Sequence, residues 1–478
     1  MAKCPFRLAN LVDVTDYGAV GDDSTDNSTP IANALAACSA GQTLFFPAGT
    51  YLCNSTVTAK DGVHMSGASP TTSWIKGRII PASNQKWQTL KLGKQGQCFG
   101  LISSGTSHDV EAIDCRFTGG DGDTGGTGIV AIIQFYGTGV IAYNYLFQGC
   151  TIEKGAALTG IANGVYLDAR GWATNYLRDI VFDTCTWEGG ERNAFELTVS
   201  STGTEANPIT TPHTGIDILH CVFEPCDNMA ISYCGRPSGA DDQGEYEMGY
   251  GTIHDNWIKD ANVNYTSGSG NHALELNGVV HVNVTDNTIE GSYVENMMDM
   301  STGGHQPGAP LRAPLTSSYH VITGNVFDGT DSPDSTMTLK GKDYTFSGNT
   351  VKVRGTNATI QHSHDAAFSG NDWRAVNSDG SLHATMKAAW ISGSNDTTFT
   401  GDTFRSKANP VVYCSTDYHS GTLVDFIPPS TYDNVSEPMY ANDIQFTNCI
   451  WYRDAGEDGV TKDANSSFTN TNPTYYDN

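Results

Sequence analysis

Three carboxylate residues occupy the same place in short strand-like segments of the chain. Glu196, Glu275 and Asp299 each stand between two apolar residues, in the segments FELT, LELN and MDMS. Because side chains alternate between the two faces of a strand, we expect the apolar neighbours to point inward and the carboxylates outward. Two carboxyl groups can act together as a general acid and a base or nucleophile, which is the chemistry of glycosidic-bond hydrolysis. These three residues are therefore the first catalytic candidates, although carboxylates on an exposed strand can also serve solubility alone.

The spacing between these carboxylates depends on how their segments stack. If each segment belongs to one coil of a repeating structure, neighbouring coils lie about 4.8 Å apart. Glu196 and Glu275 would then be separated by two coils, roughly 9–10 Å at the backbone, and Glu275 and Asp299 by one coil, roughly 5 Å. Inverting glycosidases hold their carboxyl groups about 6.5–9.5 Å apart and retaining ones about 5–5.5 Å. Both arrangements remain open from the sequence.

Long polar segments follow the strand-like segments at Glu196, Tyr233 and Asp299, at about residues 199–215, 235–251 and 301–318. Long insertions on one face of a repeat protein usually build its binding face. Asp241 and Asp242, in the second segment, are the alternative catalytic candidates because they again bring two carboxylates together. The candidate substrate-binding residues are the aromatic, cationic and acidic residues expected near the same face: Tyr166, Asp168, Arg236, Tyr246, His305, Arg312 and Lys340.

The sequence predicts no metal site and no cofactor. It contains no CxxC pair with the spacing of a zinc site. The run GGDGD at residues 119–123 is typical of a plain Gly-Asp loop more often than of a calcium site. His362 in the run HSHD falls on an inward strand position, which indicates a core histidine.

A repeated pattern determines where these segments lie. It consists of an apolar residue, then Asn, Cys or Asp three places on, then a second apolar residue two places later. A repeat of 20 to 50 residues with variable insertions indicates a solenoid, and short strand-like units make it a β-helix in which each coil pairs with its neighbours. We expect the middle residue to stack in a column at a sharp corner, since Asn tolerates the left-handed backbone conformation. The middle residues are Cys115, Cys150, Cys185, Cys221, Asn256, Asn287, Asn325, Asn349, Asn371, Asp402 and Cys449.

Three linked motifs occupy residues 13–69, in the order DYGAVGDDSTDNSTPIANAL, TLFFPAGTY and HMSGAS. They resemble the amino-terminal signature of the pectate-lyase-like family of right-handed parallel β-helices. The resemblance implies an all-β fold, a single-stranded right-handed parallel β-helix, with an N-terminal capping helix near residues 29–38. It also implies a polysaccharide-processing character, since that family includes phage tailspikes, polyuronate lyases, glycoside hydrolases and epimerases.

The predicted organisation has three parts. Residues 1–40 form a lead-in and the capping helix, residues 41–451 form the β-helix, and residues 452–478 form a C-terminal polar tail. The capping helix is expected because an open first coil would otherwise pair with other chains.

The charge balance excludes several classes of partner. Lys and Arg total 26 against 52 Asp and Glu, so the net charge is −26. This argues against nucleic acid and anionic membrane surfaces as partners. No run of 18 apolar residues occurs, so no membrane insertion is expected.

Twelve cysteines are present, and five of them are middle residues of the repeat. We expect mostly reduced, buried thiols, as in a protein made in a reducing cytosol. The first residues also lack an apolar signal segment, which fits the same expectation.

Three functions remain open at this stage. The first is a polysaccharide-degrading enzyme, an endo-acting glycoside hydrolase of the tailspike depolymerase type. The second is a polysaccharide lyase or uronate C5-epimerase, which needs a base and cations such as Lys340, Arg236, Arg312 or His305 near the uronate. The third is a non-catalytic β-helix that binds a glycan or receptor.

The resemblance to tailspikes implies a setting as well as an activity. It implies a homotrimer in a phage virion tail that acts on the host cell surface. A secreted bacterial enzyme is the alternative.

Overall fold

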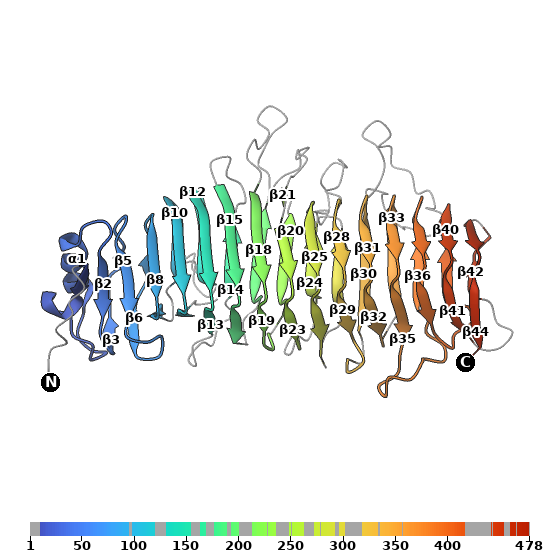
Figure 1. Cartoon of the computed structure of the whole chain (residues 1–478), viewed down its shortest axis with the longest axis horizontal. Coiled ribbons are helices and arrows are strands. Elements are labelled where there is room, and N and C mark those ends of the chain that lie inside the picture. The colour runs from blue at the N-terminus through green and yellow to red at the C-terminus, as the bar shows by residue number, and fades with distance from the viewer. Residues whose placement is uncertain are drawn as a thin grey trace, which may run out of the picture. The chain divides into compact units, whose positions relative to one another are not determined.

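The computed structural model describes most of the chain. The described residues are 10–94, 98–119, 131–153, 163–168, 176–188, 193–199, 213–226, 228–235, 248–249, 251–261, 272–277, 279–291, 296–301, 318–332, 335–355, 357–415, 441, 443–453, 459–464 and 466–477. Parallel strands dominate these residues. The strands pair side by side in stacks, and successive strands of one stack belong to successive coils of a right-handed parallel β-helix (Figure 1). The all-β fold class expected from the repeat is confirmed.

The chain divides into two compact units. The first comprises Met1–Glu196 with Gly215–Phe223, and the second comprises Leu197–Thr214 with Glu224–Asn478. Two strands have residues in both units: β17 (Phe195–Val199) and β18 (His213–Leu219).

The first unit begins with the 3-10 helix η1 (Val14–Tyr17) and the helix α1 (Ser28–Ala37) (Figure 1). Ile31, Ala34 and Leu35 form the buried side of α1, as expected for the capping helix near residues 29–38. One sheet of this unit contains β1 (Leu11–Asp13), β2 (Thr43–Phe46), β4 (Val57–Thr58), β5 (His64–Gly67), β7 (Ile79–Ile80), β8 (Gln85–Gln88), β10 (Phe99–Ile113), β12 (Ala131–Gln148), β14 (Asn163–Asp168) and β15 (Tyr176–Asp183). The other contains β3 (Gly49–Leu52), β6 (Ser73–Lys76), β9 (Lys91–Leu92), β11 (Arg116–Thr118), β13 (Thr151–Glu153), β16 (Thr186–Glu188) and β19 (Val222–Phe223).

The second unit has three stacks of parallel strands, and its coils contribute strands to each in turn. The site stack contains β20 (Ile231–Gly235), β24 (His272–Asn277), β27 (Asn296–Ser301), β30 (Thr336–Lys342), β33 (Ala358–His364), β36 (Ala389–Ser392), β39 (Val412–Ser415) and β42 (Val460–Lys462). The middle stack contains β21 (Met248–Gly249), β22 (Gly251–His254), β25 (Val282–Thr285), β28 (Val321–Thr323), β31 (Thr345–Ser347), β34 (Ala367–Ser369), β37 (Thr398–Thr400), β40 (Ile444–Thr447) and β43 (Phe468–Thr471). The back stack contains β23 (Trp257–Lys259), β26 (Thr288–Glu290), β29 (Val326–Asp328), β32 (Thr350–Val353), β35 (Asp372–Ala375), β38 (Thr403–Arg405), β41 (Ile450–Arg453) and β44 (Thr474–Asp477).

Strand pairing extends beyond the range 41–451 expected from the repeat. At the start, β1 pairs with β2 in parallel register. At the end, β42, β43 and β44 pair with β39, β40 and β41, within the segment that was expected to be a polar tail.

The middle residues of the repeat stack as expected. In the first unit the thiols of Cys150 and Cys185 donate to the carbonyls of Ala112 and Phe147, at 3.2 and 3.3 Å. Neither of these two thiols forms a disulfide, and every cysteine among the described residues is buried and outside any disulfide. This confirms the expectation of unpaired structural thiols.

In the second unit, asparagine side chains form the corresponding column. Asn287 Nδ2 donates to the carbonyl of Ile253 at 2.8 Å, and Asn287 Oδ1 accepts from the backbone N–H and the Nδ2 of Asn256 at 3.0 and 2.8 Å. The same contacts recur from one coil to the next through Asn325, Asn349 and Asn371, ending at Asp402. Burial is possible because each amide finds partners on both sides. We call this column the asparagine ladder.

The corner itself lies one residue earlier than predicted. The left-handed residues are those that precede the middle residues, such as Asp114, Thr184 and Asp286, with φ of 51°, 53° and 58°. The prediction that the middle residue adopts this conformation was therefore wrong. The preceding residue turns the chain, and the middle residue can then direct its side chain into the column.

Candidate functional site

Glu275 and Asp299 lie side by side on neighbouring coils of the second unit. The register of β24 and β27 pairs Glu275 with Asp299, and that of β20 and β24 pairs Ser232 with Glu275. Leu274 and Leu276 on either side of Glu275 are fully buried in the core. Alternation along the strand therefore directs the carboxylates away from the coil interior, as the sequence indicated.

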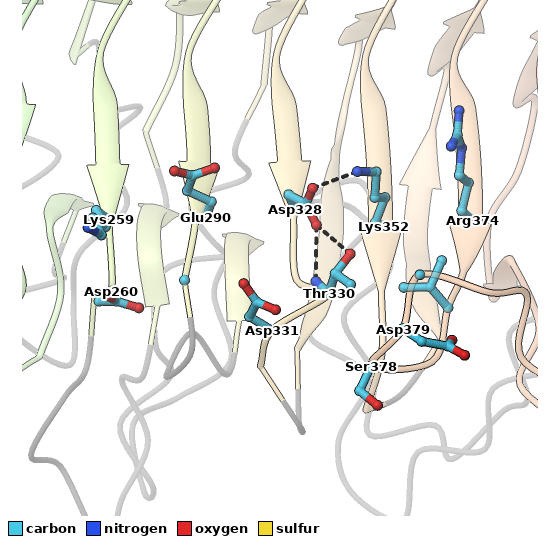
Figure 2. Close-up of a pocket in the computed structure, with 13 residues that line it drawn as sticks. Lys259, Asp260, Glu290, Asp328, Thr330, Asp331, Lys352, Arg374, Ser378 and Asp379 are labelled. Carbon is cyan, nitrogen blue, oxygen red and sulfur yellow. Dashed lines mark hydrogen bonds and ion pairs between the residues drawn. The ribbon is translucent and has the colours of Figure 1, made fainter.

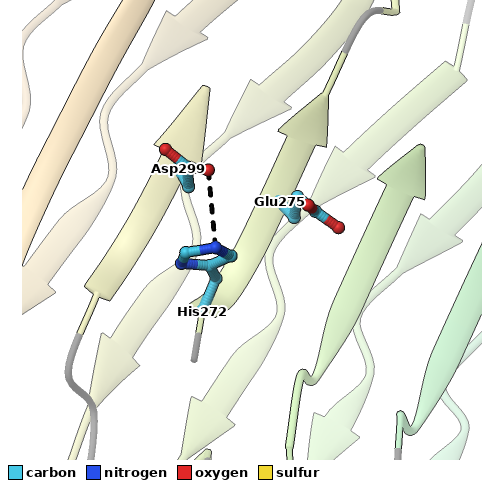
Figure 3. Close-up of side chains that lie close together, drawn as sticks. All are labelled: His272, Glu275 and Asp299. Atoms are coloured by element: carbon cyan, nitrogen blue, oxygen red, sulfur yellow. Dashed lines mark ion pairs between the residues drawn. The ribbon is translucent and has the colours of Figure 1, made fainter. Parts of the chain in front are cut away.

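A histidine completes a compact cluster with the two carboxylates (Figure 3). His272 begins β24, and its Nε2 lies 3.4 Å from Asp299 Oδ2. One ligand-capable atom from each of His272, Glu275 and Asp299 lies within 4.8 Å of the others. We call these three residues the carboxylate–histidine cluster.

Neutral polar groups hold Glu275 in place. Ser232 Oγ–H donates to Glu275 Oε2 at 2.5 Å, and Asn277 Nδ2 donates to Oε1 at 3.3 Å. Glu275 is only 8% exposed, so these bonds replace water that the carboxylate loses on burial. His272 Nδ1 is buried and has no hydrogen-bond partner among the described residues. The cluster therefore combines a carboxylate held by two polar side chains with a buried ring nitrogen that has no hydrogen-bond partner among the described residues.

The cluster can support two kinds of chemistry. Two carboxyl groups and an imidazole can transfer protons to and from a bound substrate. Carboxylate oxygens and an imidazole nitrogen also suit a divalent cation, so His272, Glu275 and Asp299 are the residues that could hold a metal ion.

Glu196 lies in the first unit and has a different environment. Asn163 Nδ2 and Asn193 Nδ2 each donate to Glu196 Oε2 at 2.8 Å, and the residue is 9% exposed. Tyr166 is also buried, and its ring stacks on Tyr136 with centroids 6.3 Å apart. The structure thus gives Glu196 two fixed amide partners.

The other predicted site residues divide into two groups. Lys340 is half-buried on β30, and Asp168 ends β14, although its side chain is outside the described part of the structure. Both remain predicted substrate-binding residues. Six candidates lie outside the described residues and also remain predictions: Asp241, Asp242, Arg236, Tyr246, His305 and Arg312.

Sequence reasoning missed His272, Ser232 and Asn277 as members of the site. Strand alternation places Ser232 and Asn277 on the same face as Glu275, but the sequence does not show their hydrogen bonds to its carboxylate. His272 precedes the aligned segment, and only the register of β24 and β27 brings its ring to Asp299.

A hollow lies against the back stack of the same unit (Figure 2). Its volume is about 510 Å³, and its lining includes residues of β23, β26, β29 and β32. Asp328 accepts from Lys352 Nζ at 2.6 Å and from Thr330 Oγ1 at 2.6 Å. Because these opposite charges already neutralise one another, this hollow is a weaker candidate for catalysis than the carboxylate–histidine cluster.

The amino-terminal motifs and the fold agree with a known family. Residues 11–84 match the family model described as rhamnogalacturonase A/epimerase, pectate lyase-like. Over these residues the chain is similar to the pectate-lyase-like family. This is the superfamily that the motifs of residues 13–69 resemble, and the parallel strand register of both units has the architecture that it implies.

Two curated fungal proteins are similar to the same region. Rhamnogalacturonase A of Aspergillus aculeatus is 33% identical over 75 residues, which are 15% of this chain and 17% of that protein. Probable rhamnogalacturonase E of Aspergillus oryzae is 40% identical over 56 residues, 12% of this chain and 13% of that protein. The chain therefore spans less than a fifth of the length of these relatives.

Among solved structures, the Dettilon tailspike protein is similar with a TM-score of 0.45 and 13% identity, over 84% of this chain and 68% of that one. The described part of the protein contains no helix long and apolar enough to cross a membrane.

Proposed function

We propose that this protein degrades a polysaccharide, and that it is an endo-acting glycoside hydrolase. The observation that carries the proposal is the pairing of Glu275 with Asp299 on adjacent coils, with His272 in the same cluster. The family match at residues 11–84 supports the substrate class, because the curated relatives are named as rhamnogalacturonases.

The geometry favours a retaining mechanism over an inverting one. An oxygen of Glu275 lies within 4.8 Å of one of Asp299, nearer to the short separation of about 5–5.5 Å than to the long one of about 6.5–9.5 Å. In this mechanism Glu275, as the acid, protonates the glycosidic oxygen while the Asp299 carboxylate attacks the anomeric carbon. Water then cleaves the glycosyl–enzyme bond and gives its proton to Glu275. His272 orients Asp299 from 3.4 Å.

A polysaccharide lyase or uronate epimerase is the second candidate. His272 favours it, because an imidazole beside a carboxylate is suited to remove the C5 proton of a uronate. Lys340, on the same stack two coils from Glu275, would then neutralise the uronate carboxylate.

The deciding experiment is a depolymerisation screen. The protein is incubated with rhamnogalacturonan, purified bacterial capsular polysaccharides and cell-wall glycans, while reducing ends and absorbance at 235 nm are followed. Hydrolysis releases reducing ends without absorbance, whereas a lyase produces both. Binding without either product would overturn the hydrolase and lyase proposals. Exchange of the uronate C5 proton with deuterium then separates an epimerase, which exchanges it, from the third candidate, a non-catalytic glycan-binding β-helix, which does not.

We also propose a location and an oligomeric state for the protein, those of a phage tailspike. The protein would act as a homotrimer in a virion tail, at the host cell surface, with a secreted bacterial enzyme as the alternative. The buried, free thiols of the described residues support synthesis in a reducing compartment before release.

A further inference from the structure

The row of residues that contains Asp299 continues across the site stack toward two aromatic side chains. The strand registers pair Asp299 with Thr338, Thr338 with Thr359, Thr359 with Trp390, and Trp390 with Tyr413. All five therefore belong to one line that crosses successive coils of the second unit. Because the coils are parallel and in register at these positions, their side chains leave the same face of the stack.

Trp390 is an exposed aromatic residue with a fixed orientation. It is 40% exposed, while its neighbours Ala389 and Ile391 are fully buried. Its indole N–H donates to Ser415 Oγ at 2.6 Å, so the polar edge of the ring is satisfied within the protein. The ring of Tyr413 lies beside it, with centroids 6.2 Å apart and an interplanar angle of 66°. The indole ring is therefore held in place and partly shielded from water, and a ligand that stacks on it need not break the hydrogen bond of its N–H.

The residues between this aromatic pair and Asp299 leave room for an extended ligand. Thr338 and Thr359 are half-buried and have short side chains. Trp390 is three coils from Asp299, which corresponds to about 14 Å along the stack. That distance exceeds one sugar ring, so only an oligosaccharide or a longer chain can reach from the carboxylates to the indole.

We propose that Trp390 and Tyr413 form a distal subsite, in which the apolar face of a pyranose ring stacks on the indole. The proposal rests on the proposed function, because the sugar belongs to the same polysaccharide chain that is cleaved between Glu275 and Asp299. The chain would lie along the line of strands rather than across it. The subsite holds the polymer in register with the carboxylates and favours long substrates over short ones.

Binding is measured first, without turnover. Every protein compared carries Glu275→Gln to remove turnover: Glu275→Gln itself and its combinations with Trp390→Ala and with Trp257→Ala are run in native gels that contain rhamnogalacturonan or a purified bacterial capsular polysaccharide. Trp257 is the matched control, since it is 41% exposed, belongs to the back stack, and donates its indole N–H to Glu290 at 2.9 Å. We expect Trp390→Ala to raise the dissociation constant obtained from the retardation by about tenfold, which is typical of the loss of a central aromatic contact. Trp257→Ala should leave the retardation unchanged.

Kinetics on the polysaccharide that is cleaved supply the second readout. Trp390→Ala should raise KM for the polymer by about tenfold with kcat unchanged, and should leave cleavage of oligosaccharides too short to reach the indole unaltered.

The outcomes separate this proposal from the proposed function. Retardation lost in Trp390→Ala, with no products from the wild type, overturns the catalytic proposal and keeps the subsite. Products from the wild type with unaltered retardation and KM in Trp390→Ala overturn the subsite alone. A lower mass of Trp390→Ala by light scattering, with normal retardation, assigns the indole to contact with a second copy and overturns the subsite. Absence of retardation by every glycan overturns both proposals.

Discussion

Asp402 ends the asparagine ladder with a carboxyl group where the preceding coils have amides. Its Oδ1 accepts from the backbone N–H and Nδ2 of Asn371, at 3.1 and 2.7 Å, as each ladder Oδ1 does. Its Oδ2 is buried and has no hydrogen-bond partner among the described residues. In the preceding members the corresponding atom is an Nδ2, which donates to a carbonyl of the previous coil. An ionised Asp402 has no hydrogen to donate there, whereas a protonated one does.

Burial raises the pKa of Asp402 to about 6 from 3.8, against the opposing hydrogen bonds of Asn371 and Trp373. The folded protein therefore binds a proton that the unfolded chain releases between pH 4 and pH 6, and the unfolding free energy decreases as pH rises through this window. The contribution is complete below about pH 4 and lost above about pH 6. A shift of about two pKa units corresponds to about 3 kcal/mol at pH 8, because each unit is about 1.4 kcal/mol.

Replacing Asp402 with Asn supplies the missing donor without a charge. We expect Asp402→Asn to raise the free energy of unfolding by up to about 3 kcal/mol at pH 8 and to change it little at pH 4, where the wild-type carboxyl is already protonated. The assay is urea denaturation followed by tryptophan fluorescence at pH 4, 6 and 8, with variant and wild type compared at each pH. Asp379→Asn is the control, because Asp379 is exposed and its pKa is lowered by Ser381. A stability difference that does not grow between pH 4 and pH 8, or a less stable variant at pH 8, would refute the reasoning.

Four further measurements test the site and the fold. Glu275→Gln should reduce turnover at least about a hundredfold with an unchanged melting temperature. The exposed control Glu111→Gln should keep full activity. Wild-type turnover in Glu275→Gln would show that catalysis takes place at another site. Asn325→Ala should lower the unfolding free energy by at least about 3 kcal/mol, since its buried ladder partners lose their hydrogen bonds, and a loss under about 1 kcal/mol in urea denaturation would contradict the ladder's role. Thiol titration of the unfolded protein should find at least about eight free thiols, and fewer would show disulfides. Light scattering should give the mass of a trimer, so a monomeric mass would exclude that assembly.

The local pattern of the sequence was sufficient to predict the β-helix, because each coil repeats the same alternation of apolar and polar residues. It placed Glu275 and Asp299 on adjacent coils, and it identified Cys150, Cys185 and the ladder asparagines as a buried column. These features depend on short-range periodicity, which a single chain displays directly. The position of the corner was less accessible, since Asp, Gly, Thr and His all occupy the left-handed position and share no single residue type.

Contacts between coils were decided only by the tertiary structure. The contact of His272 with Asp299 cannot be inferred from the length of chain between β24 and β27. In the same way, the segment between β33 and β36 does not show that Trp390 lies in register with Asp299 across the coils. A register shift between Leu339 and Gly341 shows why: one irregularity moves every later side chain relative to the preceding coil. Insertions of variable length separate the strands, so the alignment of one coil on the next is determined by packing of the buried residues rather than by spacing in the sequence. The sequence by itself determined which residues face inward and which face outward, and the register of the packed coils decided which outward residues become neighbours.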